Sequence, residues 1–475
     1  MWLCKRSHVI YRNEPPMSKS DTLNSAPITE AITSFATGSL DEGRSELALR
    51  MTRISLFDWL AVSIAGQDEP VSRIVRDYVS AEGGVAEATV VGTAQKLPAR
   101  AAAMANGTIS HALDYDDTHF AYLGHPSVAV FPASFALAQK TRASGKMFLE
   151  ASLVGMEAAT RIGTWLGRHH HFVGFHSTAT AGAFGAALAS ARLLGLDVRG
   201  AENALGLVAT RASGLRAQFG TMGKPFHAGM AASNGVEAAL LAHAGFVSRP
   251  DTLEADQGFA ITHAAEMRDP GEILDGLGKS WMFEGVLHKF HACCHGAHAS
   301  LEALIEARDR LSIVPDEVAS VSLSVPPRYL KVCNILEPQT GLEAKFSYRL
   351  CSAMVLSGRD TAALTTYSDA ACRAPDLVAL RDRVVVKGVD GLAETQATAR
   401  ITTNDGRSVE ITHDIDHMGG LALREQKIKA KAQALLGEDS ASDLWNAVKT
   451  AEPATLDEWL RGQNDPDTCT KRAAS

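Results

Sequence analysis

Features that mark several common protein classes are missing from this 475-residue sequence. No run reaches the roughly 18 uninterrupted apolar residues that a membrane-spanning helix needs, so we expect no membrane segment. Positive charge is not in excess, because 46 lysines and arginines face 54 aspartates and glutamates. The resulting net charge of −8 argues against nucleic acid as a partner. Aromatic residues make up only 6% of the chain. The core must therefore be built from small side chains, which let helices approach closely and favour a mainly helical body.

Paired cysteine motifs and common cofactor motifs are also missing. The seven cysteines form no C-x-x-C framework, and two of them, Cys293 and Cys294, are adjacent. An odd count with a vicinal pair predicts reduced thiols and a cytoplasmic location. The sequence contains no G-x-G-x-x-G fingerprint, no P-loop and no G-x-S-x-G nucleophile elbow. The sequence therefore carries no motif that supports a bound dinucleotide, a P-loop nucleotide or a serine nucleophile.

The length of the chain exceeds what one core supports, so two domains are predicted. Residues 1–26 are polar and are expected to be a disordered extension. Residues 27–275 carry long alanine-rich helical periodicities and are predicted to be the first segment of a helical domain. Residues 276–412 change to strand-like alternation mixed with helices, which predicts a smaller α+β domain with a partly antiparallel sheet. Residues 413–465 are charged and helical and are expected to return to the helical domain, before a disordered tail at 466–475.

The element predictions rest on periodicity and on turn residues. Helical spacing predicts helices over 46–66, 71–81, 147–166, 178–196, 200–213, 226–244, 298–311 and 346–356. Strand patterns cover 87–93, 317–325 and 384–387, and a strand–turn–strand pattern covers 397–412 around Asn404-Asp-Gly406.

Residues 106–130 gather more ionisable side chains than any other stretch. His111, Asp114 and Thr118 have the spacing of one helix face, and a turn then delivers His125. Three carboxylates within four residues repel one another and need cations, N–H groups, metal or water around them. The alternative is a solvated helix end.

Two further stretches place polar residues at predicted helix starts. His176 and Ser177 precede an alanine- and glycine-rich helix, whose free N–H groups suit a carboxylate, unless Ser177 is an ordinary N-cap. Lys224 lies in a glycine-rich turn before Pro225, where the positive end of the helix dipole disfavours a lysine. An anion between Lys224 and the helix start would reconcile the two. A freely solvated lysine is the alternative.

Two histidine-rich stretches invite a metal interpretation. Adjacent residues in His169–His171 point in different directions on any regular element, so a surface loop is predicted there. The cysteines and histidines of 288–298 match no common structural zinc spacing, which favours a helix start with buried cysteines. We predict no metal site.

Four motifs in order resemble the 2-methylcitrate dehydratase (MmgE/PrpD) family. They are Asp114-Tyr-Asp-Asp-Thr118 with His125-Pro-Ser, Gly174-Phe-His176-Ser-Thr178, Gly220-Thr-Met-Gly-Lys224-Pro-Phe-His, and the stretch from Lys289 to His298. The resemblance extends from about residue 28 to 460. It implies a helical domain interrupted by a smaller α+β domain, a homodimer, and chemistry on small di- or tricarboxylates without metal or organic cofactor. By similarity, active-site positions fall on Asp114, Thr118, His125, His176 and Lys224, and Tyr329 matches a second-domain tyrosine loosely.

We therefore expect a cofactor-independent lyase, a dehydratase or decarboxylase, with a cleft between its domains. In this hypothesis Lys224 and the helix start near Ser177 bind a substrate carboxylate. His125 and His176 exchange a proton with the substrate carbon or leaving group. Asp114 orients a histidine or holds water, and Thr118 fixes a polar end of the substrate.

Three alternatives stay open at this point. Elimination of water, loss of carbon dioxide and epimerisation share one carbanion-like step, so an epimerase or racemase of an imino- or amino-dicarboxylate such as iminodisuccinate is the second hypothesis. An aspartate-rich helix end also occurs in magnesium–diphosphate enzymes, but their second metal motif is missing here. The third is a non-enzymatic helical binding protein, in which alanine at His125 or His176 would disturb stability more than turnover.

Overall fold

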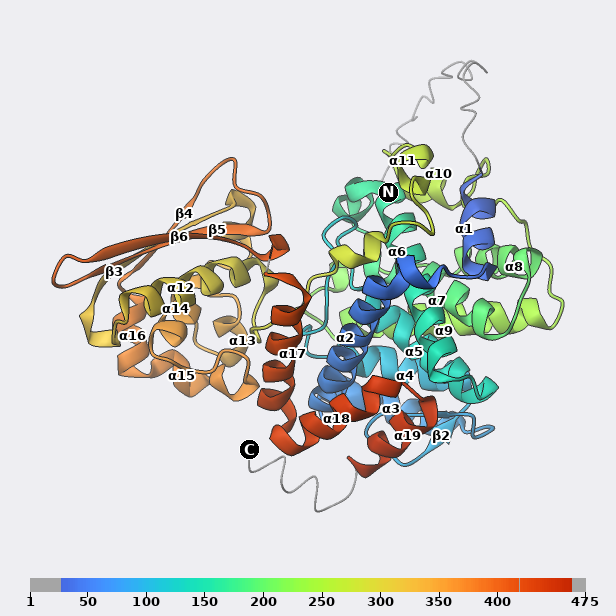
Figure 1. Cartoon of the computed structure of the whole chain (residues 1–475), viewed down its shortest axis with the longest axis horizontal. Coiled ribbons are helices and arrows are strands. Elements are labelled where there is room, and N and C mark those ends of the chain that lie inside the picture. The colour runs from blue at the N-terminus through green and yellow to red at the C-terminus, as the bar shows by residue number, and fades with distance from the viewer. Residues whose placement is uncertain (1–26, 418, 464–475) are drawn as a thin grey trace, which may run out of the picture.

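The computed structural model describes residues 27–417 and 419–463, and the extension and tail predicted at 1–26 and 466–475 lie outside the described residues. The chain is mostly helical, with one four-stranded mixed sheet in its C-terminal half, as predicted. Figure 1 shows the sheet and its helices at one end of the molecule and the larger helical domain at the other. Within the described part of the chain, no helix has both the length and the apolar character required to cross a membrane.

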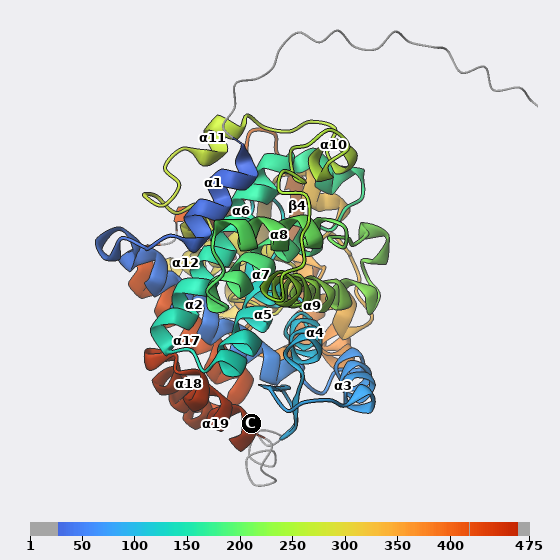
Figure 2. The same cartoon turned by 90° about the vertical axis from the view of Figure 1, so that its right-hand side faces the viewer.

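Five helices form the centre of the helical domain (Figure 2). Their interiors are alanine-rich and almost entirely buried, as the low aromatic content requires. The five are α4 (Ala99–Ser110), α5 (Pro126–Thr141), α6 (Gly145–Val173), α7 (Ser177–Leu193) and α9 (Gly223–His243).

Glycines set how closely these helices approach. A Cβ on Gly107 in α4 would lie 2.8 Å from the Cα of Gly229 in α9, and a Cβ on Gly182 in α7 would lie 2.5 Å from that of Ala129 in α5. Gly107 is near the C-terminal end of its helix, whereas the other three are near the N-terminal ends of theirs. The close contacts therefore bring the end of α4 and the starts of α5, α7 and α9 to one place.

The remaining elements of the first segment surround this centre. They are the helices α1 (Ile28–Thr37), α2 (Glu42–Gly66), α3 (Pro70–Glu82), α8 (Val198–Ala209), α10 (Phe259–His263) and α11 (Pro270–Leu274). A small hairpin of β1 (Ala88–Thr89) and β2 (Lys96–Leu97) follows α3 in the chain. The predicted helices over 46–66 and 71–81 and the strand within 87–93 are confirmed.

The sheet has the order β4-β3-β5-β6. Its strands are β3 (Val318–Val325), β4 (Val384–Gly388), β5 (Gln396–Thr403) and β6 (Ser408–Asp414). β3 and β4 are parallel, whereas β3–β5 and β5–β6 are antiparallel, so the strand–turn–strand prediction is confirmed. One face carries the helices α12 (His298–Leu311), α14 (Tyr348–Leu356) and α16 (Pro375–Arg381), with short α13 (Gly341–Ala344) and α15 (Asp369–Arg373) beside them (Figure 1).

The last three helices return to the helical domain. They are α17 (Gly420–Leu436), α18 (Glu438–Thr450) and α19 (Pro453–Gly462). Lys431 of α17 is fully buried, with its Nζ 2.6 Å from Asp58 Oδ1 in α2 and 2.6 Å from the carbonyl oxygen of Tyr115. The C-terminal segment is thus tied to the earliest part of the fold, while the predicted domain boundaries stay a prediction.

Two local predictions are wrong. α4 ends at Ser110, so Asp114 lies in a bend, Thr118 lies in a β-bridge with Leu287, and the two do not share a helix face. Asp114 has a φ of 50°, which a regular helix excludes. The expected surface loop at His169–His171 is instead the end of α6, beyond a kink at Gly167 with a φ of 75°. In both places the spacing of the apolar residues did not indicate where the helix ends or bends.

Candidate active site

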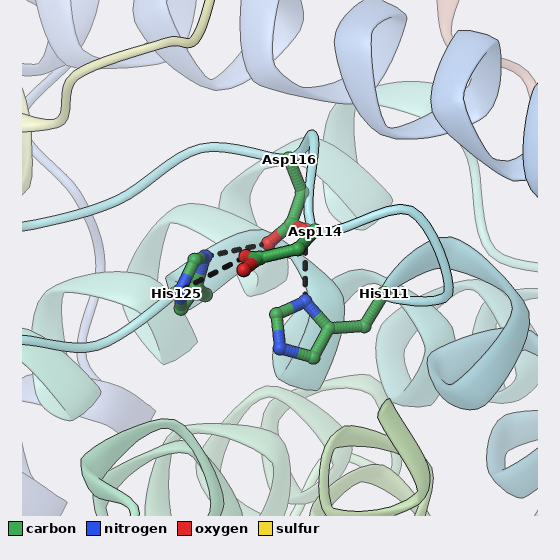
Figure 3. A group of neighbouring side chains, drawn as sticks. All are labelled: His111, Asp114, Asp116 and His125. Carbon is green, nitrogen blue, oxygen red and sulfur yellow. Dashed lines mark hydrogen bonds and ion pairs between the residues drawn. The ribbon is translucent and has the colours of Figure 1, made fainter. Parts of the chain in front are cut away.

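One carboxylate bridges two imidazoles at the centre of the candidate site (Figure 3). Asp116 Oδ1 lies 2.8 Å from His111 Nδ1, and its Oδ2 lies 2.8 Å from His125 Nδ1. The Asp116 side chain is fully buried. Burial alone would raise the pKa of its carboxyl group, but the two histidines hold that pKa well below its usual range. Because an ionised carboxylate only accepts hydrogen bonds, it fixes each ring with Nδ1 toward Asp116 and Nε2 directed away.

His125 is held neutral at physiological pH. It caps the start of α5, and its backbone N–H donates to Thr178 Oγ1 at 3.1 Å. Burial lowers the pKa of its imidazole to about 4, although Asp116 opposes that shift. A neutral imidazole with Nδ1 on a carboxylate presents Nε2 as a proton acceptor.

Asp114 joins two lysines from distant segments. Lys224 Nζ in the first turn of α9 lies 2.5 Å from Asp114 Oδ2, and Lys289 Nζ lies 3.0 Å from Oδ1. Burial would raise the pKa of the Asp114 carboxyl group, but the two ammonium groups lower it well below its usual range. His125 Nε2 is 3.7 Å from Oδ1 of the same carboxylate. Although protein atoms crowd around Asp114, 45% of its side-chain surface is accessible, so it faces an opening. The anion that was predicted beside Lys224 is thus the carboxylate of Asp114, a group of the protein itself.

His176 approaches the same centre from the start of α7. Its ring stacks at 6.0 Å from the ring of His111, and its Nδ1 lies 3.1 Å from His227 Nδ1. Burial and the charge of nearby cations lower the pKa of His176 well below its usual range, so this imidazole is also neutral. The edge of Phe219 covers it at 5.0 Å between ring centroids.

The three residues predicted to bind substrate lie farther out. Thr118 Oγ1 is 2.7 Å from His295 Nδ1, and its backbone pairs with Leu287 in both directions at 2.8 Å. Ser177 Oγ is 3.5 Å from His171 Nδ1. Tyr329 is buried and packs on Gly296, where an added Cβ would lie 2.7 Å from the tyrosine ring. None of these three has a recorded contact with Asp114 within the described residues, so they border the centre rather than form it.

Part of the centre was not predicted from the sequence. Asp116 and Lys289 contact the predicted residues directly, and His295 positions Thr118. Asp116 was visible only as one of three neighbouring aspartates. Lys289 and His295 stood in a cysteine–histidine stretch that suggested metal binding. The spacing of two residues between Asp114 and Asp116 gave no indication that each would hold a different set of partners.

The centre also contains a set of atoms that could ligate a metal. One nitrogen or oxygen each from His111, Asp114, Asp116 and His125 lies within 4.8 Å of the others. Two histidines with two carboxylates suit a divalent transition metal. However, both Nδ1 atoms already face Asp116, and Asp114 already contacts two ammonium groups, which would repel a divalent cation. The residues fit the protonic network that is present better than they fit a metal, and the metal-free site stays a prediction.

Comparison with known proteins places this centre in a family. The MmgE/PrpD N-terminal domain matches residues 30–268, and the MmgE/PrpD C-terminal domain matches residues 291–447. The chain belongs to the MmgE/PrpD family. Its N-terminal match contains Asp114, Asp116, His125, His176 and Lys224, and Lys289 lies between the two matches.

Relatives within the MmgE/PrpD family include cis-aconitate decarboxylases. The enzyme of Aspergillus terreus is 32% identical over 305 residues, which cover 61% of this chain and 62% of the relative. The cis-aconitate decarboxylase-like protein of Aspergillus oryzae is 30% identical over 303 residues, which cover 61% and 63%. The human cis-aconitate decarboxylase is 25% identical over 483 residues, which cover 94% and 97%. The matches to the two fungal relatives thus span less than two thirds of their length.

Proposed function

We propose that this protein is a lyase for a small di- or tricarboxylate, of the 2-methylcitrate dehydratase or cis-aconitate decarboxylase type. The observation that carries the proposal is the neutral imidazole of His125, fixed by Asp116 and 3.7 Å from a carboxylate that binds two lysines. A base that lies this close to the carboxylate between two ammonium groups suits proton transfer at a carbon atom next to a substrate carboxylate. The cis-aconitate decarboxylases among the relatives support the reaction class.

In this proposal Lys224 and Lys289 bind one substrate carboxylate beside Asp114. Each ammonium group has three N–H donors and spends only part of them on Asp114. Their charge stabilises the enolate-like anion that forms when a proton or carbon dioxide leaves the neighbouring carbon. His125 Nε2 takes up or returns the proton. His176, which is neutral and reaches the centre from another helix, serves as the second proton-transfer group.

Epimerisation of an imino- or amino-dicarboxylate is the second candidate. Epimerisation needs one group to remove a proton and another to deliver it to the opposite face. His125 and His176 precede the starts of different helices, and each packs against His111, at 4.7 Å and 6.0 Å between ring centroids. That arrangement supports two-base chemistry as well as lyase chemistry.

The test is turnover of defined acids by the purified protein. Separate incubations with 2-methylcitrate, cis-aconitate and iminodisuccinate are followed by NMR in deuterated buffer. We expect 2-methylcitrate or cis-aconitate to be consumed. His125→Ala should lower kcat/KM by about a hundred- to ten-thousandfold, because it removes the proton acceptor. The melting temperature should be unchanged, unlike in a non-enzymatic binding protein where this histidine serves stability. The control His243→Ala changes an exposed imidazole at the end of α9 and should leave turnover intact.

Two outcomes would change this assignment. Deuterium exchange on iminodisuccinate alone would favour the epimerase, and no turnover or exchange on any of the three acids would contradict both candidates. Elemental analysis of the same preparation tests the metal-free proposal, which a stoichiometric divalent metal would contradict. A homodimer is proposed on the family resemblance, and light scattering after size exclusion would test it.

A further inference from the structure

The two lysines that contact Asp114 leave no spare positive charge for a polyanion. Lys224 and Lys289 are balanced by Asp114 and Asp116, and His125 is neutral. A di- or tricarboxylate brings two or three negative charges. Two ammonium groups that already face two protein carboxylates can compensate at most one negative charge of the substrate well. Any further substrate carboxylate therefore needs a cation from outside this set.

Three arginines from both domains gather beside the centre. Arg168 belongs to α6, Arg216 to the turn before α9, and Arg328 to the segment after β3. Burial lowers the pKa of Arg328, and the charges of Arg168 and Arg216 lower it further, so the three guanidinium groups lie within electrostatic reach of one another. One carboxylate, Glu394, accepts from both Arg168 and Arg328, with Arg168 Nη2 at 2.6 Å. The cluster of three guanidinium groups therefore contains one carboxylate, which pairs with two of them.

Arg216 is the member of this cluster without an anion. Its Nη1 donates to the carbonyl oxygen of His171 at 3.0 Å, and no carboxylate pairs with it among the described residues. Its Nε is buried and has no hydrogen-bond partner in the described part of the chain. Burial, and next the charges of Arg216 and Arg328, lower the pKa of the nearby His171 to about 3. A buried guanidinium N–H without an acceptor is costly, and a planar carboxylate would satisfy it by bidentate hydrogen bonding.

Two aromatic rings connect the arginines to the catalytic centre. The Phe219 ring has Arg216 Cζ at 5.7 Å and Lys224 Nζ at 5.4 Å from its centroid, and it also covers His176. The Tyr329 ring has Arg328 Cζ at 5.4 Å and packs on Gly296. Arg216 and Lys224 thus border the same ring, at a separation that a small polycarboxylate can span.

We propose that Arg216, supported by Arg168 and Arg328, binds the substrate carboxylate that lies farthest from Lys224. The inference rests on the proposed function and adds to it the residue that binds a second, separated carboxylate of the substrate. Lys224 and Lys289 hold the carboxylate next to the reacting carbon, and Arg216 holds the distal one. Because Arg328 and Glu394 belong to the α+β domain, the distal carboxylate contacts both domains. Loss of this contact lowers the affinity for the substrate but leaves the proton acceptor in place.

The experiment is a binding measurement that needs no turnover. Propane-1,2,3-tricarboxylate and butanoate are titrated by calorimetry into wild type, Arg216→Gln and Arg216→Lys at constant ionic strength. The matched control is Arg211→Gln, an exposed arginine five residues earlier that pairs with Glu237. Loss of a charge-assisted bidentate contact should raise the Kd of the tricarboxylate about ten- to a hundredfold in Arg216→Gln, with a smaller rise in Arg216→Lys. Butanoate binding should change less than about twofold in every variant.

Three results would overturn the inference. They are an unchanged tricarboxylate Kd in Arg216→Gln, an equal loss for tricarboxylate and butanoate, and no tricarboxylate binding to the wild type. Failure of the lyase proposal looks different, because then tricarboxylate binding would depend on Arg216 while none of the tested acids is turned over. Arg216→Gln that keeps the wild-type melting temperature excludes unfolding as the cause of weaker binding.

Discussion

Asp116 is the residue on which the proposed acid–base chemistry depends, although it faces no substrate. It accepts from His111 and pairs with His125, so it sets the orientation of both rings. In Asp116→Asn the amide keeps the shape of the side chain but can donate to Nδ1, which favours the tautomer with the proton on Nε2. The proton acceptor of His125 would then point the wrong way. We expect kcat to fall about a hundred- to ten-thousandfold, while the melting temperature changes little.

A tautomer measurement separates positioning from structural damage. Nitrogen-15 NMR should report Nδ1–H on His111 and His125 in the wild type and a shift toward Nε2–H in Asp116→Asn. Asp382→Asn changes an exposed aspartate and provides the control. Full activity in Asp116→Asn, or loss of activity with unchanged tautomers, would contradict the positioning role of this carboxylate.

At the scale of elements, the close contact between α4 and α9 sets the distance from Asp114 to Lys224. A Cβ on Gly107 would meet the backbone of Gly229 at 2.8 Å and that of Ala228 at 3.0 Å, and backbone atoms cannot rotate away. Gly107→Ala should therefore separate the two helices by a few tenths of an ångström. We expect a loss of about 1–3 kcal/mol in the free energy of unfolding, despite the better helix propensity of alanine, together with a lower kcat.

Gly462→Ala at the end of α19 is the matched control for this substitution. A Cβ there meets nothing within 4 Å, so stability and kcat should stay at the wild-type level. Equal stability and activity in Gly107→Ala and Gly462→Ala, measured by denaturant unfolding and by turnover, would show that helix spacing does not control the site.

The same elements show what the sequence could and could not predict. Helices such as α2 and α9 and the β5–β6 hairpin were predicted because period and turn residues are local properties. The end of α4 was misplaced, because the apolar spacing of α4 continues past the point where the chain turns. The partners of Asp114 are 110 and 175 residues away, and no local pattern carries that information. His125, His176, Lys224 and Asp114 lie near one another in the fold, and their catalytic roles stay a prediction. The ion pairs of both lysines with one carboxylate are visible only in the folded chain.

For the whole molecule, Lys431 ties the C-terminal helices to the start of the fold. α17 lies between the α+β domain and α2 (Figure 1), and the Lys431 ammonium group fills a buried position between Asp58 and the carbonyl of Tyr115. Burial raises the pKa of Asp58 to about 6 even though Lys431 opposes the shift, so the Asp58 carboxyl group is ionised at pH 7.5. Lys431→Met should therefore leave a buried carboxylate unpaired and lower the free energy of unfolding by about 3–5 kcal/mol.

The double variant Asp58→Leu/Lys431→Met distinguishes this cost from a loss of packing. Replacing both charges removes the unpaired carboxylate, so denaturant unfolding should recover most of the lost stability and give a coupling free energy of several kcal/mol. Arg268→Met, which breaks an exposed pair with Glu272, should leave stability unchanged. If the double variant is as unstable as the sum of the single variants, the two charges do not act as a pair. The returning helices must then be held by their other contacts, such as the ion pair of Asp457 with Lys96.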